Sequence, residues 1–575
     1  MEREHVVAIP SQGSQLSAED EGHGWPLWLL IGGTVVLFAG TPMPITDRDT
    51  VVYGTIAKNI LASGDWLTLH HHTMAMVDKP PLTIWFMSLS FLLFGISEWA
   101  IRAWHILFAV GTVLATYALA RLALSPRQAI LSALVLLGSV QFFYQSLVPE
   151  QDIPLTLFVT LTLYWHLRWE REGMAREAVF AWLCMALAAL TKGLVGLALP
   201  VMIIGVHLVV DRPRLPSRAL SATIAGALVF TLVATPWFIV GAIRQGQPFI
   251  DTFFIHGTGP GRFFHQYFNE PMTVPGWVGF GAYVPLLLLG VLPWTGWVWP
   301  ALREGWAAKK NRPSALWVYT LWLIVIFAFL SVSLGDKVSR YLLPLFPPLA
   351  VLVGRALDEA KLAKSAAWVS LGGAIPLVAL MIFVLVWKFP GEVGLYAPLF
   401  LSFLPAFIAA LVGYSLATFS GRPRMGLILL VALTFLSYGL AMIAVDRHWD
   451  QISPWRPFAR IVNKIEAPAA RVLVLEPYNE FADFYIMRPK EFVSEADLAQ
   501  GWRNGSVIAI LPSEVMDRLP APQPMILDRP AHGSLVLVSN FPVQPPREGS
   551  GSFVSGSGWA AGQALTTGRT RPEQP

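Results

Sequence analysis

The amino-acid sequence predicts an all-α polytopic membrane protein, with about thirteen transmembrane helices and a small C-terminal α/β domain. Three observations support this fold class. Hydrophobic residues make up 54% of the 575 residues and charged residues only 14%, whereas a soluble domain carries about 25% charged residues. The mean hydropathy is +0.54, and long apolar runs recur between residues 26 and 445. Beyond residue 446, short runs of β-branched residues replace them.

The apolar runs give the predicted spans. A hydrocarbon core about 30 Å thick needs roughly 17 to 25 helical residues. A further run at 81–95 is short and opens at Pro80-Pro81, so we interpret it as a juxtamembrane helix that does not cross. The runs that meet the requirement, some of them loosely, lie at 26–42, 103–123, 129–147, 153–168, 178–191, 194–210, 219–243, 275–298, 314–334, 341–354, 366–387, 395–417 and 425–445.

The charges of the loops indicate the orientation. If the N-terminal tail, residues 1–24, is cytoplasmic, the loops on the same side carry nearly every basic cluster, from Arg121 and Arg127 to Arg422 and Arg424. This is the distribution that the positive-inside rule expects. If 81–95 crossed, the later clusters would face outward instead. The sequence therefore predicts a multi-pass protein of the bacterial inner membrane, in which residues 43–102 form the first periplasmic loop and contain juxtamembrane helices.

The C-terminal part has a different pattern from the predicted membrane domain, residues 25–445. Residues 446–545 are predicted to form a periplasmic α/β domain, because short β-branched runs alternate there with helical patterns. Residues 546–575 are rich in Gly, Ser and Thr and are predicted to be a disordered tail. The elements predicted in the α/β domain are a helix at 454–465 and strands at 471–475, 506–511 and 534–539.

In this orientation, ionisable residues from several loops lie on the outer face. A membrane protein keeps such groups chiefly where it handles a polar substrate or an ion, so we expect the chemistry at this face. The polar part of the first periplasmic loop is the most informative segment because of its acids and histidines. The outer-face residues are Asp49, Lys79, Glu150, Asp152, Lys192, His256, Arg262, Lys337 and Arg340.

Two acids stand at predicted helix starts on this face. Asp49 lies in the first turn of a predicted helix at 50–62, where the helix dipole alone would favour an acid. Asp47 is the more natural N-cap, which leaves Asp49 available for other roles. Asp152 precedes Pro154 and an apolar helix, so it too could serve only as a cap. Placed together, two such acids can act as a general base or hold a metal beside a phosphate.

Several basic residues occupy positions, in an apolar stretch or in outer loops, where basic residues are otherwise rare in this sequence. Lys192 interrupts a continuous apolar stretch, where a charge is costly to insert. Arg262, Lys337 and Arg340 occupy outer loops, against the positive-inside trend. Outer cations of this kind suit an anionic ligand such as a phosphate. Lys79 has an alternative role as a membrane-edge lysine whose ammonium group reaches the lipid headgroups.

Other functional classes find little support. The adjacent histidines at 70–72 alternate sides on an extended chain, and no cysteine or HExxH spacing accompanies them to form a zinc site. The single cysteine, Cys184, lies in an apolar run and provides no disulfide framework. The net charge is only +4, and basic residues in short loops argue against a nucleic-acid surface.

An ordered set of motifs resembles the polyprenyl-phosphate-sugar-dependent glycosyltransferases of the GT-C superfamily. The resemblance covers roughly residues 25–450, and it is closest to the aminoarabinose (4-amino-4-deoxy-L-arabinose) lipid A transferase and protein mannosyltransferase group. Each motif is weak alone, and the ordered set is strong. The motifs are Asp49 to Tyr53, Leu61–Trp66, Asp78–Leu82, Asp152–Leu155, Leu190–Gly193, Thr235–Trp237, His256 to Phe263 and Lys337 to Pro344.

The resemblance implies an inverting transferase that takes a sugar from undecaprenyl phosphate. The sugar would be 4-amino-4-deoxy-L-arabinose or another pentose or hexose, and the acceptor would be lipid A, lipopolysaccharide or another envelope component at the periplasmic face. Some members of the group use a divalent ion, so a metal held by Asp49 and Asp152 is left open, and no other cofactor is expected. The implied roles are catalysis for Asp49 and Asp152, donor-phosphate binding for Lys79, Arg262, Lys192, Lys337 and Arg340, and substrate binding for Tyr53, Glu150, His256 and Tyr341.

The chain departs from the group at the first motif. Relatives commonly carry Asp-Glu there and an Arg just before the Tyr, whereas this chain has Thr50 and Val52 at those positions. These departures leave the acceptor open. A protein O-mannosyltransferase is the alternative within the enzyme class. A lipid-linked sugar flippase is a rival from another class, although its ionisable residues would be expected near the bilayer midplane on broken helices.

Overall fold

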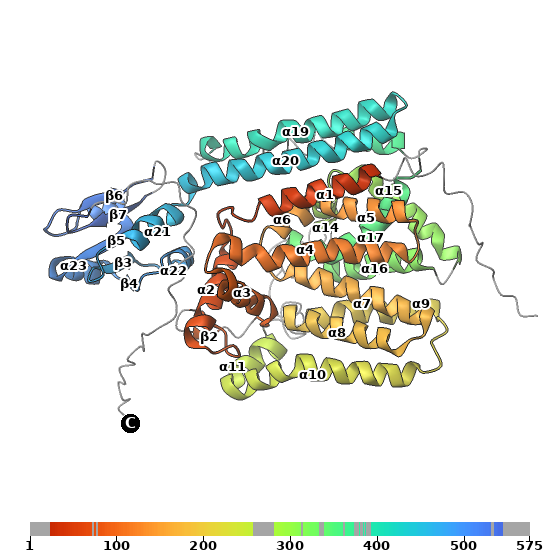
Figure 1. Ribbon diagram of the computed structural model, residues 1–575, viewed down its shortest axis with the longest axis horizontal. Coiled ribbons are helices and arrows are strands. Elements are labelled where there is room, and N and C mark those ends of the chain that lie inside the picture. Colours follow the sequence, from red (N-terminus) through yellow and green to blue (C-terminus); the bar gives the residue numbers. More distant parts are fainter. Residues whose placement is uncertain are drawn as a thin grey trace, which may run out of the picture.

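A computed structural model describes most of the chain, and it shows a mostly helical bundle with a small sheet at one end (Figure 1). The predicted strands at 471–475, 506–511 and 534–539 all form, within one or two residues. The described residues are 24–71, 74–75, 79–256, 281–311, 314–332, 338–359, 363–372, 393–530 and 534–543, together with the isolated positions 379, 383 and 386.

The helices follow the predicted apolar runs closely in the described part of the chain. The predicted run at 366–387 lies largely outside the described residues. The helices of the bundle are α1 (Gly24–Ala39), α2 (Arg48–Ser63), α3 (Leu82–Phe94), α4 (Glu98–Arg121), α5 (Pro126–Gly138), α6 (Val140–Ser146), α7 (Asp152–Glu172), α8 (Ala175–Lys192), α9 (Leu194–Asp211), α10 (Ala219–Gln245), α11 (Gln247–Ile250), the π-helix η2 (Asp251–His256), α14 (Tyr283–Gly290), α15 (Thr295–Ala307), the 3₁₀ helices η3 (Ala308–Asn311) and η4 (Ser339–Leu345), α16 (Ala315–Val332), α17 (Phe346–Ala356), α19 (Val393–Phe419) and α20 (Pro423–Ile452).

Six described helices are long and apolar enough to cross a membrane, namely α4, α9, α10, α16, α19 and α20. The number rises to eight if two bent pairs each count as one span: α5 with α6, which meet at 67°, and α14 with the helical segment that begins at Thr295, which meet at 109°. The multi-span helical fold is therefore established, and the count of thirteen stays a prediction. The short run predicted not to cross is α3, which has 13 residues.

Helix α2 begins and ends where its sequence predicts. The side chain of Asp47 caps it by accepting a hydrogen bond from the backbone N–H of Thr50 at 2.7 Å. Gly64 ends it with a φ of +73°, a left-handed conformation that glycine adopts without a Cβ penalty. Since Asp47 provides the cap, Asp49 in the first turn keeps its carboxylate for other partners, as the sequence predicted.

The C-terminal part forms a mixed five-stranded sheet in the order β4-β3-β5-β7-β6. Strands β4, β3 and β5 run parallel, whereas β7 pairs antiparallel with both β5 and β6. The two strands that the sequence did not predict, β4 and β6, form the edges. The elements are α21 (Trp455–Lys464), β3 (Arg471–Leu475), α22 (Glu480–Tyr485), β4 (Lys490–Val493), α23 (Glu495–Asn504), β5 (Val507–Pro512), α24 (Ser513–Met516), β6 (Met525–Asp528) and β7 (Leu535–Ser539).

A buried polar junction joins this sheet region to the helical bundle. The hydroxyl of Tyr485, at the end of α22, donates to Glu98 Oε1 at 2.7 Å and accepts from the backbone N–H of Ile45 at 3.1 Å. A nitrogen of Arg456 lies 3.6 Å from the other carboxylate oxygen of Glu98. Buried polar groups must find partners of this kind, so the sheet region is fixed to the start of α4 and to the segment before α2.

A second set of contacts attaches α22 to α2 itself. Arg48, the first residue of α2, forms an ion pair with Glu480. The ammonium group of Lys58 donates to the backbone carbonyls of Asp483 and Phe484 at 2.9 and 3.0 Å. Burial lowers the pKa of Lys58 to about 7. The position of α2, and of the acid in its first turn, therefore depends on the C-terminal part of the chain.

We predict that Tyr485→Phe destabilises the protein by about 1–3 kcal/mol, because it leaves the Ile45 N–H and a Glu98 oxygen buried without their partner. Denaturant unfolding of the purified protein in detergent measures the change. The matched control is Tyr117→Phe, since the Tyr117 hydroxyl makes no hydrogen bond within the described residues, and it should change stability by less than about 0.5 kcal/mol. Equal effects of the two variants would contradict the proposed junction.

Candidate active site

Arg340 gathers three carboxylates from two separate segments of the chain. It lies in η4, and one terminal nitrogen is 3.2 Å from Asp49 Oδ2 on α2. The other terminal nitrogen is 2.8 Å from Glu150 Oε1 in the loop before α7. Its Nε is 3.8 Å from Asp152 Oδ2 at the start of α7. Residues almost 300 positions apart in the sequence therefore meet in one place, which we call the acid–cation cluster.

Lys192 and Tyr341 complete the cluster. Lys192 is the last residue of α8, where Gly193 ends the helix with a φ of +62°. Its ammonium group lies 2.5 Å from Asp152 Oδ1 and 4.6 Å from the centre of the Tyr341 ring. The Arg340 guanidinium lies 5.9 Å from the same ring. A cation over an aromatic face is attracted by the ring quadrupole, so Tyr341 steadies both cations.

The three acids differ in how accessible they are. The side chain of Asp49 is 47% exposed, whereas those of Glu150 and Asp152 are only 6% and 4% exposed. Asp152 does not cap α7, since no side-chain capping bond forms there, and its carboxylate binds Lys192 instead. Asp49 is thus the acid of the cluster that an incoming molecule can reach, and Asp152 holds a cation in place.

Glu150 stands in a different electrostatic environment. Burial raises the pKa of Glu150 to about 8 against the opposing effect of Arg340, and the nearby carboxylates of Asp152, Asp47 and Asp49 raise the pKa further. The side-chain amide of Gln145 donates to Glu150 Oε2 at 2.9 Å. A buried carboxyl with this pKa is mainly protonated at neutral pH.

The sequence did not single out the residues that position the cluster. Arg102, buried on α4, donates to the backbone carbonyl of Leu147 at 2.9 Å and to that of Pro44 at 2.8 Å. It also donates to the carbonyls of Thr41 and Met43. One guanidinium thereby holds both the loop before α2 and the loop before Glu150. The sequence signal that could have revealed it is a lone arginine at the outer end of an apolar helix.

The cluster contains six of the predicted site residues. Of the other five, two are described, and three lie outside the described residues or have a side chain that is not described. Tyr53 is buried on α2, one turn beyond Asp49, and Lys79 is half-buried just before Pro80. Arg262 and Lys337 lie outside the described residues, and His256 ends η2 with a side chain that is not described. The residues brought together are Asp49, Glu150, Asp152, Lys192, Arg340 and Tyr341.

The described part of the chain contains no group of three or more His, Cys, Asp or Glu residues arranged to hold a metal ion. Asp49 and Asp152 both face Arg340, so the carboxylates are neutralised by a cation of the protein itself. His71, in a short strand pair (β1, His70–His71; β2, Met74–Ala75), lies edge-on to Tyr478 at 5.6 Å. Whether a divalent ion joins the acids in the reaction stays a prediction to be tested.

We predict that the stability of the Glu150→Gln variant relative to the unchanged protein rises as the pH rises from 5 to 9. The pKa of Glu150 is higher in the folded state than its ordinary value of 4.5. The proton on Glu150 therefore stabilises the folded state fully below about pH 4.5, and this stabilisation is lost as the pH rises through 8. Glutamine stays neutral and escapes this loss. Thermal unfolding at both pH values measures the difference.

The control for this experiment is Glu466→Gln, which changes an exposed glutamate in the C-terminal part of the chain. The melting temperature of this variant relative to the unchanged protein should be the same at pH 5 and pH 9. A difference between Glu150→Gln and the unchanged protein that does not vary with pH would rule out a protonated Glu150.

Comparisons with known proteins give a consistent result. The family described as dolichyl-phosphate-mannose-protein mannosyltransferase matches residues 78–239. The chain is 30% identical over 334 residues to the undecaprenyl phosphate-alpha-4-amino-4-deoxy-L-arabinose arabinosyl transferase of Edwardsiella ictaluri, covering 57% of this chain and 58% of that protein. It is 27% identical over 391 residues to a protein of the same description, numbered 2, from Proteus mirabilis, covering 65% and 68% of the two chains.

A solved structure has the same fold. The crystal structure of ArnT from Cupriavidus metallidurans bound to undecaprenyl phosphate superposes with a TM-score of 0.73 at 22% identity, covering 90% of this chain and 98% of that one. The apo structure of the same protein gives a TM-score of 0.70. These matches confirm the resemblance, predicted from the motifs, to the polyprenyl-phosphate-sugar-dependent GT-C glycosyltransferases of the aminoarabinose transferase and protein mannosyltransferase group.

Proposed function

We propose that this protein is an inverting glycosyltransferase that moves a sugar from undecaprenyl phosphate to lipid A, lipopolysaccharide or another envelope acceptor. The observation that carries the proposal is the acid–cation cluster, in which one half-exposed carboxylate stands beside two cations at one end of a helical bundle. Relatives described as undecaprenyl phosphate-alpha-4-amino-4-deoxy-L-arabinose arabinosyl transferases support it. They favour 4-amino-4-deoxy-L-arabinose as the sugar.

The leaving group of this reaction is the phosphate of the donor lipid. Negative charge grows on that phosphate as the bond to the sugar breaks, and fixed cations stabilise it in the transition state. Lys192 and Arg340 are the cations of the cluster, and Lys79, Arg262 and Lys337 are proposed to join them. In the free protein, Arg340 and Lys192 are paired with carboxylates, so a bound phosphate would compete with these acids for the cations.

Asp49 is the proposed general base. It would take the proton from the acceptor hydroxyl while the hydroxyl oxygen forms a bond to the anomeric carbon of the sugar. The bond between that carbon and the phosphate oxygen breaks on the opposite side, which inverts the configuration. Asp152 positions Lys192, Tyr341 steadies the cations, and Tyr53, Glu150 and His256 are proposed substrate contacts. A divalent ion, if bound, would be held by Asp49 and Asp152 and would neutralise phosphate charge.

The orientation and the number of spans belong to the same proposal. The sheet region contacts α2 and the start of α4, at the end of the bundle that carries the cluster. We therefore place the cluster and residues 446–545 on the periplasmic side, with residues 1–24 in the cytoplasm and about thirteen spans between them. The segment 546–575 is proposed to be a disordered tail.

A protein O-mannosyltransferase is the second candidate, and the family match over residues 78–239 favours it. Both candidates use a lipid-phosphate donor, so the cluster does not distinguish them. Membranes incubated with a radiolabelled undecaprenyl-phosphate sugar separate the candidates, since label enters lipid or glycan in one case and protein in the other. The flippase alternative gains no support from the cluster, which joins helix ends and loops.

We predict that Asp49→Asn lowers sugar transfer by about 10²–10⁴-fold, the range expected for loss of a general base, and leaves the amount of protein in the membrane unchanged. Transfer from radiolabelled donor in membranes measures the rate. The control is Asp47→Asn, because asparagine caps a helix as well as aspartate does, and it should retain most of the activity. Normal transfer by the Asp49→Asn variant would refute the role of this carboxylate.

We predict that Lys192→Gln raises the KM for the lipid-linked donor roughly tenfold or more, since a charge-assisted bond to the phosphate is lost. Steady-state kinetics at varied donor concentration measure the effect. The exposed Lys364 provides the control, and its glutamine variant should leave the KM unchanged. An unaltered KM in the Lys192→Gln variant would argue against donor binding by this lysine.

A further inference from the structure

A polar cavity lies at the end of the bundle opposite the acid–cation cluster. Its volume is about 350 Å³, which lies within the range of small-molecule sites, about 300–1,000 Å³. Helices α4 and α7 begin at the cluster end and run to the other end, where α5 begins (Figure 1). Residues near the start of α5 line the cavity. The cavity is lined by Trp25, Arg127, Leu131, Trp297, Leu357, Asp358, Ala363, Tyr414, Pro423, Arg424 and Leu427.

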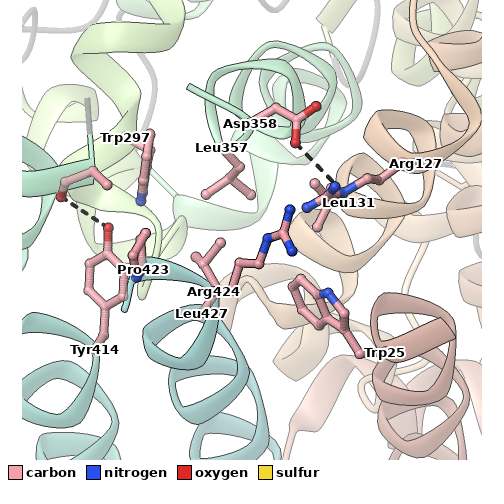
Figure 2. A pocket seen from close by; sticks show the side chains of 11 residues that line it. Trp25, Arg127, Leu131, Trp297, Leu357, Asp358, Tyr414, Pro423, Arg424 and Leu427 are labelled. Atoms are coloured by element: carbon pink, nitrogen blue, oxygen red, sulfur yellow. Dashed lines mark hydrogen bonds and ion pairs between the residues drawn. The ribbon is translucent and has the colours of Figure 1, made fainter. Parts of the chain in front are cut away.

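Two guanidinium groups dominate the charge of this cavity (Figure 2). Arg127, near the start of α5, has its Nε 3.7 Å from Asp358, and this buried Nε makes no hydrogen bond within the described residues. Arg424 points its guanidinium group into the space between Arg127 and Trp25. No hydrogen bond or ion pair joins Arg424 to any residue in the described part of the chain. One carboxylate therefore faces two positive charges, and the site as a whole is positive.

The arrangement fits a phosphate group better than any group of the protein itself. Arginine donates in a fork that matches phosphate oxygens, and an anion between two guanidinium groups removes their mutual repulsion. Both arginines lie in the first turns of their helices, α5 and α20. The positive ends of the two helix dipoles add to the field that favours an anion.

The rest of the lining is apolar and aromatic. Leu131, Leu357 and Leu427 supply aliphatic surface, while Trp25 and Trp297 supply indole rings. A free phosphate ion would leave this surface in contact with water, whereas a phosphate carried on a glycerol and acyl chains would cover it. The cavity also lies at the start of α20, a helix that is long and apolar enough to cross a membrane. Basic pockets between such helices bind anionic lipids.

We propose that this cavity binds the phosphate headgroup of an anionic phospholipid from the cytoplasmic leaflet, held between Arg127 and Arg424. The site is separate from the acid–cation cluster, and the proposal does not depend on the reaction assigned to that cluster. The opposing explanation is that both arginines merely follow the positive-inside rule. In that case, losing them would not change the affinity for lipid.

The test uses the full-length protein in a neutral detergent. Thermal unfolding is followed while phosphatidylglycerol, phosphatidylcholine, glycerol phosphate or inorganic phosphate is added. A ligand that binds only the folded state raises the melting temperature in a saturable way. We expect saturable stabilisation by phosphatidylglycerol and a roughly tenfold or greater loss of its apparent affinity in the Arg127→Gln/Arg424→Gln variant, since bonds between charged groups are lost.

The matched control is Arg214→Gln/Arg422→Gln, which removes two exposed arginines from the same end of the bundle but outside the cavity lining. It should keep the affinity for phosphatidylglycerol within about twofold. Equal affinities in the cavity variant and the unchanged protein overturn the proposal. Equal stabilisation by inorganic phosphate or glycerol phosphate also overturns it, because the ligand would then be a soluble phosphate.

A second measurement keeps the proposal testable if the cavity variant does not fold. Phosphatidylglycerol with a photoreactive headgroup is crosslinked to the unchanged protein, and the labelled peptides are identified by mass spectrometry. Label in peptides that contain Arg127, Asp358 or Arg424 supports the proposal. Label that is confined to other segments overturns it. Equal labelling of these peptides by phosphatidylcholine that carries the same photoreactive group also overturns it.

Discussion

The ion pairs of Arg340 are the constraint on which the rest of the site depends. One guanidinium binds acids from the start of α2, the loop before α7 and the start of α7. Glu150 and Asp152 are almost completely buried. A buried charge such as that of Asp152 is stable only when it is paired, and a buried polar group such as the protonated carboxyl of Glu150 needs hydrogen-bond partners. The chain therefore cannot place Glu150 and Asp152 without also placing η4 beside them. The same pairing leaves Asp49 half-exposed and oriented, so the interaction that holds these segments together also presents the proposed general base.

A shell of backbone contacts surrounds this cluster and extends to the sheet. Arg102 binds the carbonyls of two loops that precede cluster residues, and its neighbour Glu98 binds Tyr485 in the C-terminal part. Lys58 attaches the middle of α2 to the end of α22. The sheet region thus fixes the position of the helix that carries Asp49.

Local sequence patterns predicted much of this arrangement, whereas contacts between distant segments could not be predicted from such patterns. The Asp47 cap, the end of the helix predicted at 50–62 and the misplaced charge of Lys192 are each visible within a few residues, and each was predicted. Gln145, Arg102 and Glu98 look like ordinary polar residues of helical runs, and only contacts with distant segments give them a role. The bends within two of the predicted apolar runs were also beyond local signals. Hydropathy does not reveal a bend, and two helix pairs bend by 67° and 109°.

The two charged sites differ in how completely the protein satisfies their cations, and this difference indicates how each would bind a ligand. In the cluster, Arg340 and Lys192 already have carboxylate partners, so a phosphate that enters must replace existing ion pairs. The net gain in binding free energy is therefore small, which suits a donor lipid that has to bind and dissociate in every catalytic cycle. In the opposite cavity, Arg127 pairs with one carboxylate at 3.7 Å, and Arg424 makes no ion pair within the described residues. A phosphate that binds there displaces only one ion pair, so most of its favourable binding free energy is retained. Such a site suits a lipid that remains bound to the protein.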